Sequence, residues 1–433
     1  MSSTHDTTQQ TTAQDDTGRA VAPAAESADR PVTGEDWRAH HSSSILPALG
    51  RPQRLLVRGE GIHVWDETGK RYTDLLAGIA VNSLGHAHPA IVEALSQQVG
   101  TLGHISNYFA SPPQIALAEH VLRLIGAPEG SSVYFSNSGA EANEAAFKIT
   151  RRTGRTKIVA VEGSFHGRTM GALALTSKAA YRTPFDPGVP GVVHVPFGDE
   201  QALRDAVDES TAAVILEPIQ GESGVRRHPA GYLRAAREAT TAAGALLVLD
   251  EVQTGIGRTG AWFAFQHPEV GEGIVPDVVT LAKGLGGGMP IGATVTFGSA
   301  VTQLLQPGQH GSTYSGNPLA TSVAGAVLAT LEADGLVAHA AELGERTHAL
   351  LADLPEVAEV TGAGLLLGVE LTDGRAKAVA DAALEAGFIV NPVTDTRLRL
   401  APPLIITDEP LREFAQALPG LVATAAQPTG AGA

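Results

Sequence analysis

A lysine and an aspartate, 33 residues apart, are the first candidates for chemistry in this chain. Lys283 follows the apolar run VVTLA and precedes GLGGG, and Asp250 ends the apolar run LLVLD. A lysine at the end of a buried strand loses solvation, so its pKa falls and its amine can attack a carbonyl carbon. A buried carboxylate needs a cationic partner, and the protonated nitrogen of a pyridine-type cofactor would be one. The alternatives are a solvated lysine and an acid that caps the next turn.

A turn of small residues, Ser138, Gly139 and Ala140, joins the strand-like SVYFSN to the helix-like EANEAAFKITRR. Backbone N–H groups at such a helix N-terminus can bind an anion such as phosphate. Ser138 and Glu141 also have the spacing of a capping box, which is compatible with anion binding. The glycines at 284–288 lack the G-x-G-x-x-G spacing, so they do not indicate a dinucleotide site.

Further candidates lie in SFHGRT, EPIQGESGV and TRLRLAPPL. Phe165 is placed to stack on a flat ring, although a phenylalanine at a strand end is more often part of the core, and His166 is more often structural. Arg168 and Arg399 are candidate clamps for carboxylates, because a guanidinium binds a carboxylate through two hydrogen bonds. The alternative for both arginines is a surface position. Glu222 is a candidate internal counter-ion for such an arginine.

Short apolar runs that alternate with amphipathic helical stretches must position these residues. Runs that are buried on both faces are typical of a mainly parallel sheet covered by helices, whose ligands bind at the carboxyl ends of the strands. The predicted strands are SVYFSN (132–137), KIVAVEG (157–163), AAVILEP (212–218), ALLVLDE (245–251) and VVTLAKG (278–284).

The two ends of the ordered region have a different pattern. Residues 326–425 contain a long helical stretch with a glycine interruption and then the strand-like GLLLGVEL (364–371) and FIVNPV (388–393), which is typical of a smaller α+β domain. The early segment LLVRGEGIHVWDETGKRYTDLLAG alternates like a hairpin, and we expect it to pack with that domain. We therefore predict these parts: a disordered tail 1–33, an N-terminal segment 34–90, a large domain 91–325, a small domain 326–425 and a loose end 426–433.

Composition restricts the class of protein. The formal net charge of −16 disfavours nucleic acid or an anionic membrane as a partner, and the lack of cysteine excludes disulfides and thiolate chemistry. The first 30 residues contain no apolar segment typical of a secretory signal, and no apolar run reaches the roughly 18–20 residues of a membrane span. We expect a cytoplasmic protein.

Six motifs in order resemble the class III aminotransferases, which depend on pyridoxal phosphate (PLP). The resemblance covers about residues 50–415, and its motifs are NSGAEANEAAFK, SFHGRT, EPIQGESGV, LVLDEVQTGIGRTG, LAKGLGGGMPIGA and HGSTYSGNPLA. It implies an α/β protein of PLP fold type I, with a mostly parallel seven-stranded sheet in the large domain and a smaller α+β domain from both chain ends. It also implies a homodimer with shared active sites.

The resemblance assigns a role to each candidate. Lys283 would carry PLP as a Schiff base and then move the substrate proton, and Asp250 would pair with the pyridine nitrogen. The remaining cofactor contacts would be Phe165 and Val252 on the two ring faces, Gln253 at the phenolic oxygen, Gly139 and Ala140 at the phosphate, and Thr313 from the neighbouring subunit. The predicted substrate contacts are Arg168, Glu222, Ser312 and Arg399. No metal is expected.

The segments LLAGIAVNSLGHAHP and GHISNYFASPPQIALAEHV are most similar to the acetylornithine aminotransferase family, which serves arginine synthesis. In that family the two arginines bind the carboxylates of glutamate, 2-oxoglutarate and acylated ornithine, and the acid that matches Glu222 releases the second arginine. Ornithine aminotransferases carry a tyrosine near the position of Gly78, so its absence favours an acylated substrate.

Other reactions remain open from the sequence. The amine donor could instead be succinylornithine, N-succinyl-diaminopimelate, 4-aminobutyrate or free ornithine. From a different class, the fold also supports an aminomutase, which needs no clamp for a keto acid, and the pair of Arg399 with Glu222 argues against it. A binding protein without catalysis is disfavoured by the presence of both Lys283 and Asp250.

Overall fold

The computed structural model describes residues 37–425, so the predicted tails 1–33 and 426–433 lie outside the described residues. The described residues divide into two compact units, 37–57 with Asp66–Gly69, and Arg58–Trp65 with 70–425. The described part of the first unit contains helix α1 (Trp37–Ser44), where the indole N–H of Trp37 donates to Glu67 over 3.1 Å. The domain boundaries proposed from the sequence stay predictions.

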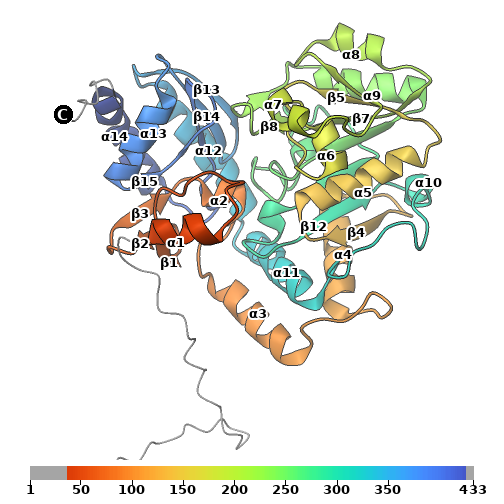
Figure 1. Cartoon of the computed structure of the whole chain (residues 1–433), viewed down its shortest axis with the longest axis horizontal. Helices are drawn as coiled ribbons and strands as arrows, with labels where there is room; N and C mark the ends of the chain where they lie inside the picture. The colour runs from red at the N-terminus through yellow and green to blue at the C-terminus, as the bar shows by residue number, and fades with distance from the viewer. Residues whose placement is uncertain (1–36, 426–433) are drawn as a thin grey trace, which may run out of the picture. The chain divides into compact units, whose positions relative to one another are not determined.

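A seven-stranded sheet forms the centre of the second unit (Figure 1). All of its strand pairs are parallel except those of β12, which runs antiparallel to both neighbours. The α/β class and the mostly parallel sheet predicted from the sequence are therefore confirmed. In spatial order the strands are β4 (Ser132–Ser136), β12 (Gly292–Thr296), β11 (Val278–Leu281), β10 (Leu246–Asp250), β7 (Thr211–Leu216), β5 (Lys157–Val161) and β6 (Val192–Val195).

Helices cover both faces of this sheet, which explains why its central strands are mainly apolar. Successive side chains of a strand point to opposite faces. Leu247 belongs to the core cluster that contains Leu233 of helix α9, whereas its neighbour Val248 belongs to the cluster that contains Phe147 of α5. The helices of this region are α4 (Pro112–Ile125), α5 (Gly139–Arg151), α6 (Met170–Leu175), α7 (Ala179–Arg182), α8 (Glu200–Ala206), α9 (Tyr232–Ala243), α10 (Ser299–Thr302) and α11 (Pro318–Ala333).

A second, antiparallel sheet follows along the chain. Its order is β13 (Val357–Ala363), β14 (Leu366–Leu371), β17 (Arg397–Leu400) and β16 (Asn391–Pro392). Helix α12 packs on β13, and α13 packs on both β16 and α14. These helices are α12 (Leu336–Ala352), α13 (Ala376–Ala386) and α14 (Asp408–Ala425).

The predicted strand FIVNPV is not one strand. Its first part, β15 (Phe388–Ile389), pairs in parallel with β3 (Arg71–Asp74), whereas its second part is β16 of the antiparallel sheet. β15 thus joins a C-terminal segment to the early hairpin. The order of this third sheet is β1 (Leu56–Glu60), β2 (His63–Asp66), β3 and β15.

The chain enters the site region through a left-handed turn, α2 (Ala77–Ala80), before helix α3 (Pro89–Thr101). All four residues of α2 have positive φ, from 50° at Ala77 to 68° at Ile79, although only Gly78 is a glycine. Left-handed backbone costs a residue with a side chain roughly 1–2 kcal/mol. Asp74 holds the turn, because its carboxylate accepts hydrogen bonds from the backbone of Leu76 and Ala77.

Among residues 37–425, no single helix is long and apolar enough to cross a membrane, although the bent pair α11 and α12 meets that length and composition together.

Candidate active site

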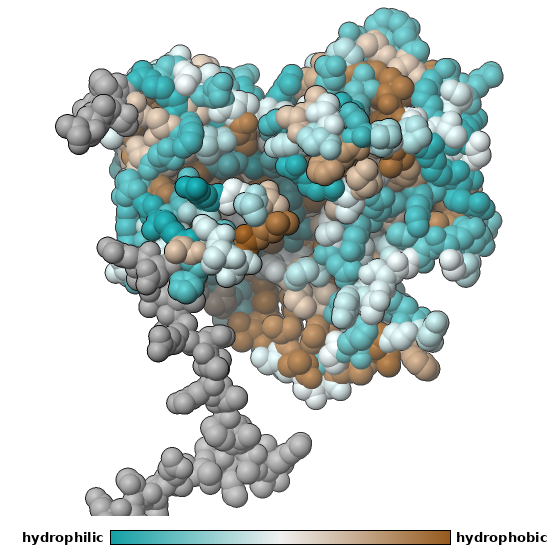
Figure 2. All heavy atoms as spheres, in the orientation of Figure 1, coloured by the Kyte–Doolittle hydropathy of each residue, from teal (hydrophilic) through white to brown (hydrophobic). Residues whose placement is uncertain are grey.

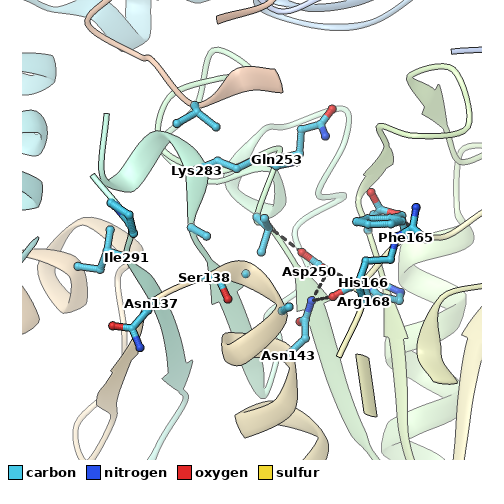
Figure 3. A pocket seen from close by; sticks show the side chains of 18 of the residues that line it. Asn137, Ser138, Asn143, Phe165, His166, Arg168, Asp250, Gln253, Lys283 and Ile291 are labelled. Atoms are coloured by element: carbon cyan, nitrogen blue, oxygen red, sulfur yellow. Dashed lines mark hydrogen bonds and ion pairs between the residues drawn. The ribbon is translucent and has the colours of Figure 1, made fainter. Parts of the chain in front are cut away.

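A cavity of about 450 Å³ lies at the carboxyl ends of the central strands, where the sequence places its candidates (Figure 3). Residues from β10, the N-terminus of α5, the SFHGR segment and the segment around Lys283 form its wall. The predicted residues that line it are Gly139, Ala140, Phe165, Arg168, Glu222, Asp250, Val252, Gln253 and Lys283. The structure therefore brings together residues that are up to 144 positions apart in the chain (139 to 283).

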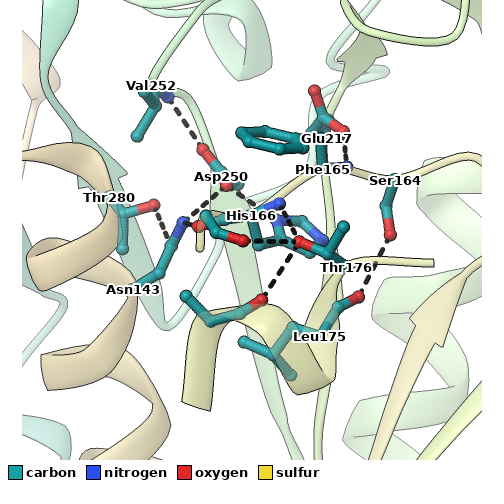
Figure 4. Close-up of polar contacts among 12 residues, drawn as sticks. Asn143, Ser164, Phe165, His166, Leu175, Thr176, Glu217, Asp250, Val252 and Thr280 are labelled. Atoms are coloured by element: carbon teal, nitrogen blue, oxygen red, sulfur yellow. Dashed lines mark hydrogen bonds and ion pairs between the residues drawn. The ribbon is translucent and has the colours of Figure 1, made fainter. Parts of the chain in front are cut away.

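Asp250 is the last residue of β10 and is held by three hydrogen-bond donors (Figure 4). Its Oδ2 atom accepts from Nδ2 of Asn143 at 2.8 Å and lies 2.7 Å from Nδ1 of His166, and its Oδ1 atom accepts from the backbone of Val252 at 3.0 Å. The carboxyl group is almost fully buried. Three donors fix the orientation of this carboxylate.

A further layer of contacts fixes these donors. Nδ2 of Asn143 also donates to the carbonyl of His166, and its Oδ1 accepts from Thr280, the residue that pairs with Asp250 in the parallel register of β10 and β11. The backbone N–H of His166 donates to Thr176. Sequence reasoning missed the role of Asn143. Asn143 lies four residues after Gly139, so it is on the same face of α5, and this spacing could have indicated that it faces the site.

Lys283 begins a short 3-10 turn (Lys283–Leu285), two residues after β11 ends. Its backbone has a φ of 42°, so the position is strained. Burial lowers the pKa of its amine below the ordinary value. Within the described residues the amine has no hydrogen bond or ion pair, which leaves it available to a ligand in the cavity.

The N-terminus of α5 presents unpaired backbone donors. Ser138 is the N-cap, and its side chain and carbonyl accept from the N–H groups of Glu141 and Ala142. The N–H groups of Gly139 and Ala140 precede the first intrahelical bonds, and neither has an acceptor in the part of the chain that the structure describes. This is the arrangement that binds phosphate at a helix N-terminus.

Gly139 leaves space that a larger residue would fill. A Cβ atom at this position would lie 2.8 Å from Cγ1 and 2.9 Å from Cγ2 of Val252. Val252 and Phe165 both line the cavity, so apolar side chains are available for the faces of a flat ring.

Arg399 lies almost fully buried on β17 beside this cavity. Its Nη1 atom donates to Oε1 of Glu222 at 2.6 Å and to Oε1 of Gln253 at 3.2 Å, and its Nη2 atom donates to Oδ1 of Asn391 at 2.7 Å. Burial acts to raise the pKa of Glu222, but the charge and hydrogen bond of Arg399 outweigh it, so the pKa of Glu222 is lowered. The predicted counter-ion pair is thus present.

Gln253 and Arg168 have contacts that the sequence does not predict. The amide oxygen of Gln253 is bonded to Arg399, so its role at a phenolic oxygen stays a prediction. Arg168 is exposed at the cavity wall, with its guanidinium carbon 3.5 Å from the ring centre of Tyr181. Arg168 has no ion pair with residues 37–425, which leaves its charge free for a carboxylate.

The structure does not bring Ser312 and Thr313 into the cavity. Ser312 accepts a hydrogen bond from Asn137, which does line the cavity, whereas Thr313 is exposed. An exposed Thr313 is compatible with a role in the site of a second subunit, and that role stays a prediction.

Glu217 is a buried acid in the cavity wall that the sequence analysis did not single out. Its carboxylate accepts from the backbone N–H of Phe165 at 2.9 Å and of Gly221 at 3.2 Å, so it joins the SFHGR segment to the loop of Glu222. Burial, assisted by the charge of Asp250, raises its pKa to about 7. The available signal was an acid at the end of the apolar run AAVILE.

These residues fit PLP. The cavity combines a buried amine and helix N-terminal N–H groups that have no partner among residues 37–425, a fixed carboxylate for a ring nitrogen, and apolar side chains for the ring faces. The absence of a side chain at Gly139 keeps space beside Val252. Each part of the cofactor has a matching chemical group.

Comparison with known proteins agrees with this fit. A model of the family "Aminotransferase class-III" matches residues 48–422. The chain belongs to the class III aminotransferases, which use PLP. It is 57% identical over 385 residues to the acetylornithine aminotransferase of Mycolicibacterium smegmatis, with 88% of this chain and 97% of that protein covered.

Solved structures give the same assignment of fold. The acetylornithine aminotransferase of Elizabethkingia anophelis is 33% identical with a TM-score of 0.78, over 90% of this chain and 98% of that one. The ornithine aminotransferase of Toxoplasma gondii, described with partial occupancy of PLP at its active site, is 32% identical with a TM-score of 0.84, over 91% of this chain and 96% of that one. The predicted class III fold is therefore confirmed.

Proposed function

We propose that this enzyme transfers the distal amino group of N2-acetyl-L-ornithine to 2-oxoglutarate, a step of arginine biosynthesis. The products are N-acetyl-L-glutamate 5-semialdehyde and L-glutamate. The observation that carries the choice of donor is the 57% identity with the acetylornithine aminotransferase of M. smegmatis over nearly its whole length. Gly78 supports it, because no side chain at this position can contact a free α-amino group.

Lys283 and Asp250 act on two different protons, that of the substrate carbon and that of the ring nitrogen. When bound, PLP supplies an electron sink for the charge that remains after a proton leaves the amine-bearing carbon. The Nζ atom of Lys283, with its lowered pKa, takes this proton and returns it. Asp250, held by Asn143 and His166, keeps the proton on the ring nitrogen.

Arg168 and Arg399 divide the recognition of carboxylates. With N-acetylornithine, Arg168 at the cavity wall binds the α-carboxylate, and Arg399 stays paired with Glu222. With glutamate, Glu222 leaves, and Arg399 binds the α-carboxylate while Arg168 binds the distal one. The exchange at Arg399 therefore depends on the position of the Glu222 carboxylate.

A comparison of amine donors tests this proposal. Each amine donor is assayed with 2-oxoglutarate as the acceptor. We expect kcat/KM for N-acetylornithine to be higher than for succinylornithine, N-succinyl-diaminopimelate, 4-aminobutyrate or ornithine. Ornithine should be lower by about tenfold or more, since its free α-amine is buried without a partner. A higher value for ornithine or 4-aminobutyrate would overturn the choice of donor, and isomerisation of the donor without 2-oxoglutarate would indicate an aminomutase.

We also propose a homodimer with shared active sites. Helix α3 buries none of its 13 residues, and Val92, Leu95 and Val99 on it are exposed. Figure 2 shows apolar side chains gathered over α3, at the lower edge of the view. Tyr108 and Tyr314 are 92% and 61% exposed. An apolar surface of this kind is typical of a subunit interface.

Mixing two variants that are each impaired in a different subunit's contribution tests the shared site. Each proposed site takes Lys283 from one subunit and Thr313 from the other. In a mixed dimer of Lys283→Ala and Thr313→Ala, both substitutions therefore fall in the same site, and the second site has both native residues. We expect the mixture to regain activity after subunit exchange. A monomer in analytical ultracentrifugation, or a mixture as inactive as its components, would contradict the proposal. The cytoplasmic location stays a prediction.

A further inference from the structure

Arg399 is held between an acceptor on a paired strand, Asn391, and an acceptor on a loop, Glu222. Asn391 lies directly opposite Arg399 in the antiparallel register of β16 and β17, so the backbone fixes both residues. Glu222 instead belongs to the loop between β8 (Ile219–Gln220) and β9 (Arg226–Arg227). The side chain of Glu222 is 36% exposed, whereas that of Arg399 is 1% exposed.

The two acceptors also differ in charge and in the atom that they bind. Asn391 takes a hydrogen bond from Nη2 over 2.7 Å and is neutral, whereas Glu222 takes one from Nη1 over 2.6 Å and is charged. An incoming carboxylate therefore competes with Glu222 for the charge of Arg399 but does not need to displace Asn391. Nε of Arg399 has no acceptor in residues 37–425 and remains available as a donor.

Glu222 is the charged acceptor of Arg399. Without another contact, the long side chain of Arg399 would tend to follow the Glu222 carboxylate when that carboxylate moves. The contact to Asn391 opposes this movement, because β16 pairs with the strand that carries Arg399. Gln253 gives a second neutral contact, on Nη1. A charged acceptor in place of Asn391 would keep the orientation but would neutralise the arginine permanently.

We propose that Asn391 is a positioning residue that determines specificity: it anchors Arg399 through Nη2 and, being neutral, leaves the arginine's charge available to the α-carboxylate of an amino-acid substrate. This inference rests on the proposed function, in which glutamate uses Arg399 and N-acetylornithine does not. Loss of the anchor therefore affects the two half-reactions unequally.

The test uses single-turnover half-reactions of the PLP-loaded enzyme with glutamate and with N-acetylornithine, followed by cofactor absorbance. Asn391→Asp should lower kcat/KM for glutamate by about tenfold or more, mainly through KM, because the added carboxylate competes with the substrate. Asn391→Ala should lower it also, because the anchor is lost. The N-acetylornithine half-reaction should stay within about threefold of wild type for both.

Gln416→Glu, which makes the same amide-to-carboxylate change at an exposed position of α14, is the matched control and should leave both half-reactions unchanged. Equal slowing of both half-reactions, or no slowing with glutamate, would overturn the role of Asn391. If one Asn391 variant does not fold, the other carries the test. A wild-type enzyme that fails to react with N-acetylornithine or with glutamate would instead refute the proposed function.

Discussion

Nδ1 of His166 lies 2.7 Å from Oδ2 of Asp250, and both side chains are buried. Asn143 donates to the same oxygen at 2.8 Å. The carboxylate therefore has a fixed direction before any ligand arrives, and its position at the end of β10 points it into the cavity (Figure 3).

His166→Ala should lower kcat by about 10- to 100-fold, because a hydrogen bond to a charged group contributes about 1.5–3 kcal/mol. PLP should still bind, since Lys283 is unchanged. Steady-state kinetics and the cofactor spectrum check both parts. His348→Ala is the control, because it removes a 2.9 Å contact to the carbonyl of Val360, away from the cavity wall. If the two variants have equal kcat, His166 does not position Asp250.

Lys283→Ala should abolish turnover and the covalent attachment of PLP. Removal of a nucleophile that also moves the proton costs about 10³-fold or more in kcat. The measurement is the mass of the protein after PLP addition and borohydride reduction, which should show the cofactor adduct only in wild type. Lys377→Ala, an exposed residue paired with Asp381, should behave like wild type. An adduct of equal yield in Lys283→Ala would place the covalent site elsewhere.

Gly139→Ala should weaken PLP binding by about tenfold, because the new Cβ would overlap with the methyl groups of Val252 at 2.8–2.9 Å. Titration of the apoenzyme with PLP measures the dissociation constant. Gly325→Ala is the control, since nothing lies within 4 Å of a Cβ there and alanine is the better helix former. Unchanged PLP affinity in Gly139→Ala would argue against a ligand next to this glycine.

The central strands could be predicted because burial on both faces requires continuous apolar sequence. β4, β5, β10 and β11 fall within predicted runs, and β7 begins one residue before its run. β12 was not predicted, because its sequence GATVT is short and rich in small residues and its place in the sheet depends on antiparallel pairing with β4 and β11. The split of 388–393 into β15 and β16 likewise depends on partners that are distant in sequence.

A site residue could be predicted from the sequence where its type and its position at a strand or helix end indicate a chemical role. Lys283, Asp250 and Gly139 lie at strand and helix ends, and the structure places all three at one cavity. Asn143 and Asn391 carry no such signal, because an amide acquires its role only from the residue that it contacts. That contact depends on the packing of α5 in the first case and on the β16–β17 register in the second.

His228 provides a test of pH dependence. Its ring is stacked between Phe197 and Tyr232, with ring centres 4.6 Å apart on both sides. Its Nε2 atom donates to the carbonyl of Glu217 at 3.1 Å, and its buried Nδ1 atom has no partner among residues 37–425. Burial lowers the pKa of His228 from 6.5 to about 4.

Between these two pKa values the unfolded chain binds a proton that the folded chain does not. The contribution of neutral His228 to the free energy of unfolding is therefore fully present above pH 6.5. This contribution is lost as the pH falls toward 4, by about 3 kcal/mol in total. His228→Phe keeps the stacking and removes the titration. It should cost about 1 kcal/mol at pH 8 through the lost hydrogen bond, and it should lose less stability than wild type on acidification.

Melting temperatures at fixed protein and PLP concentrations between pH 4.5 and 8 measure this difference. The wild-type value should fall more steeply below pH 6.5 than that of His228→Phe, because only wild type must protonate a buried ring on unfolding. His40→Gln, at an exposed position of α1, should follow the wild-type curve. Parallel curves for wild type and His228→Phe would mean that His228 does not hold its neutral form in the folded protein, and that the acid sensitivity has another source.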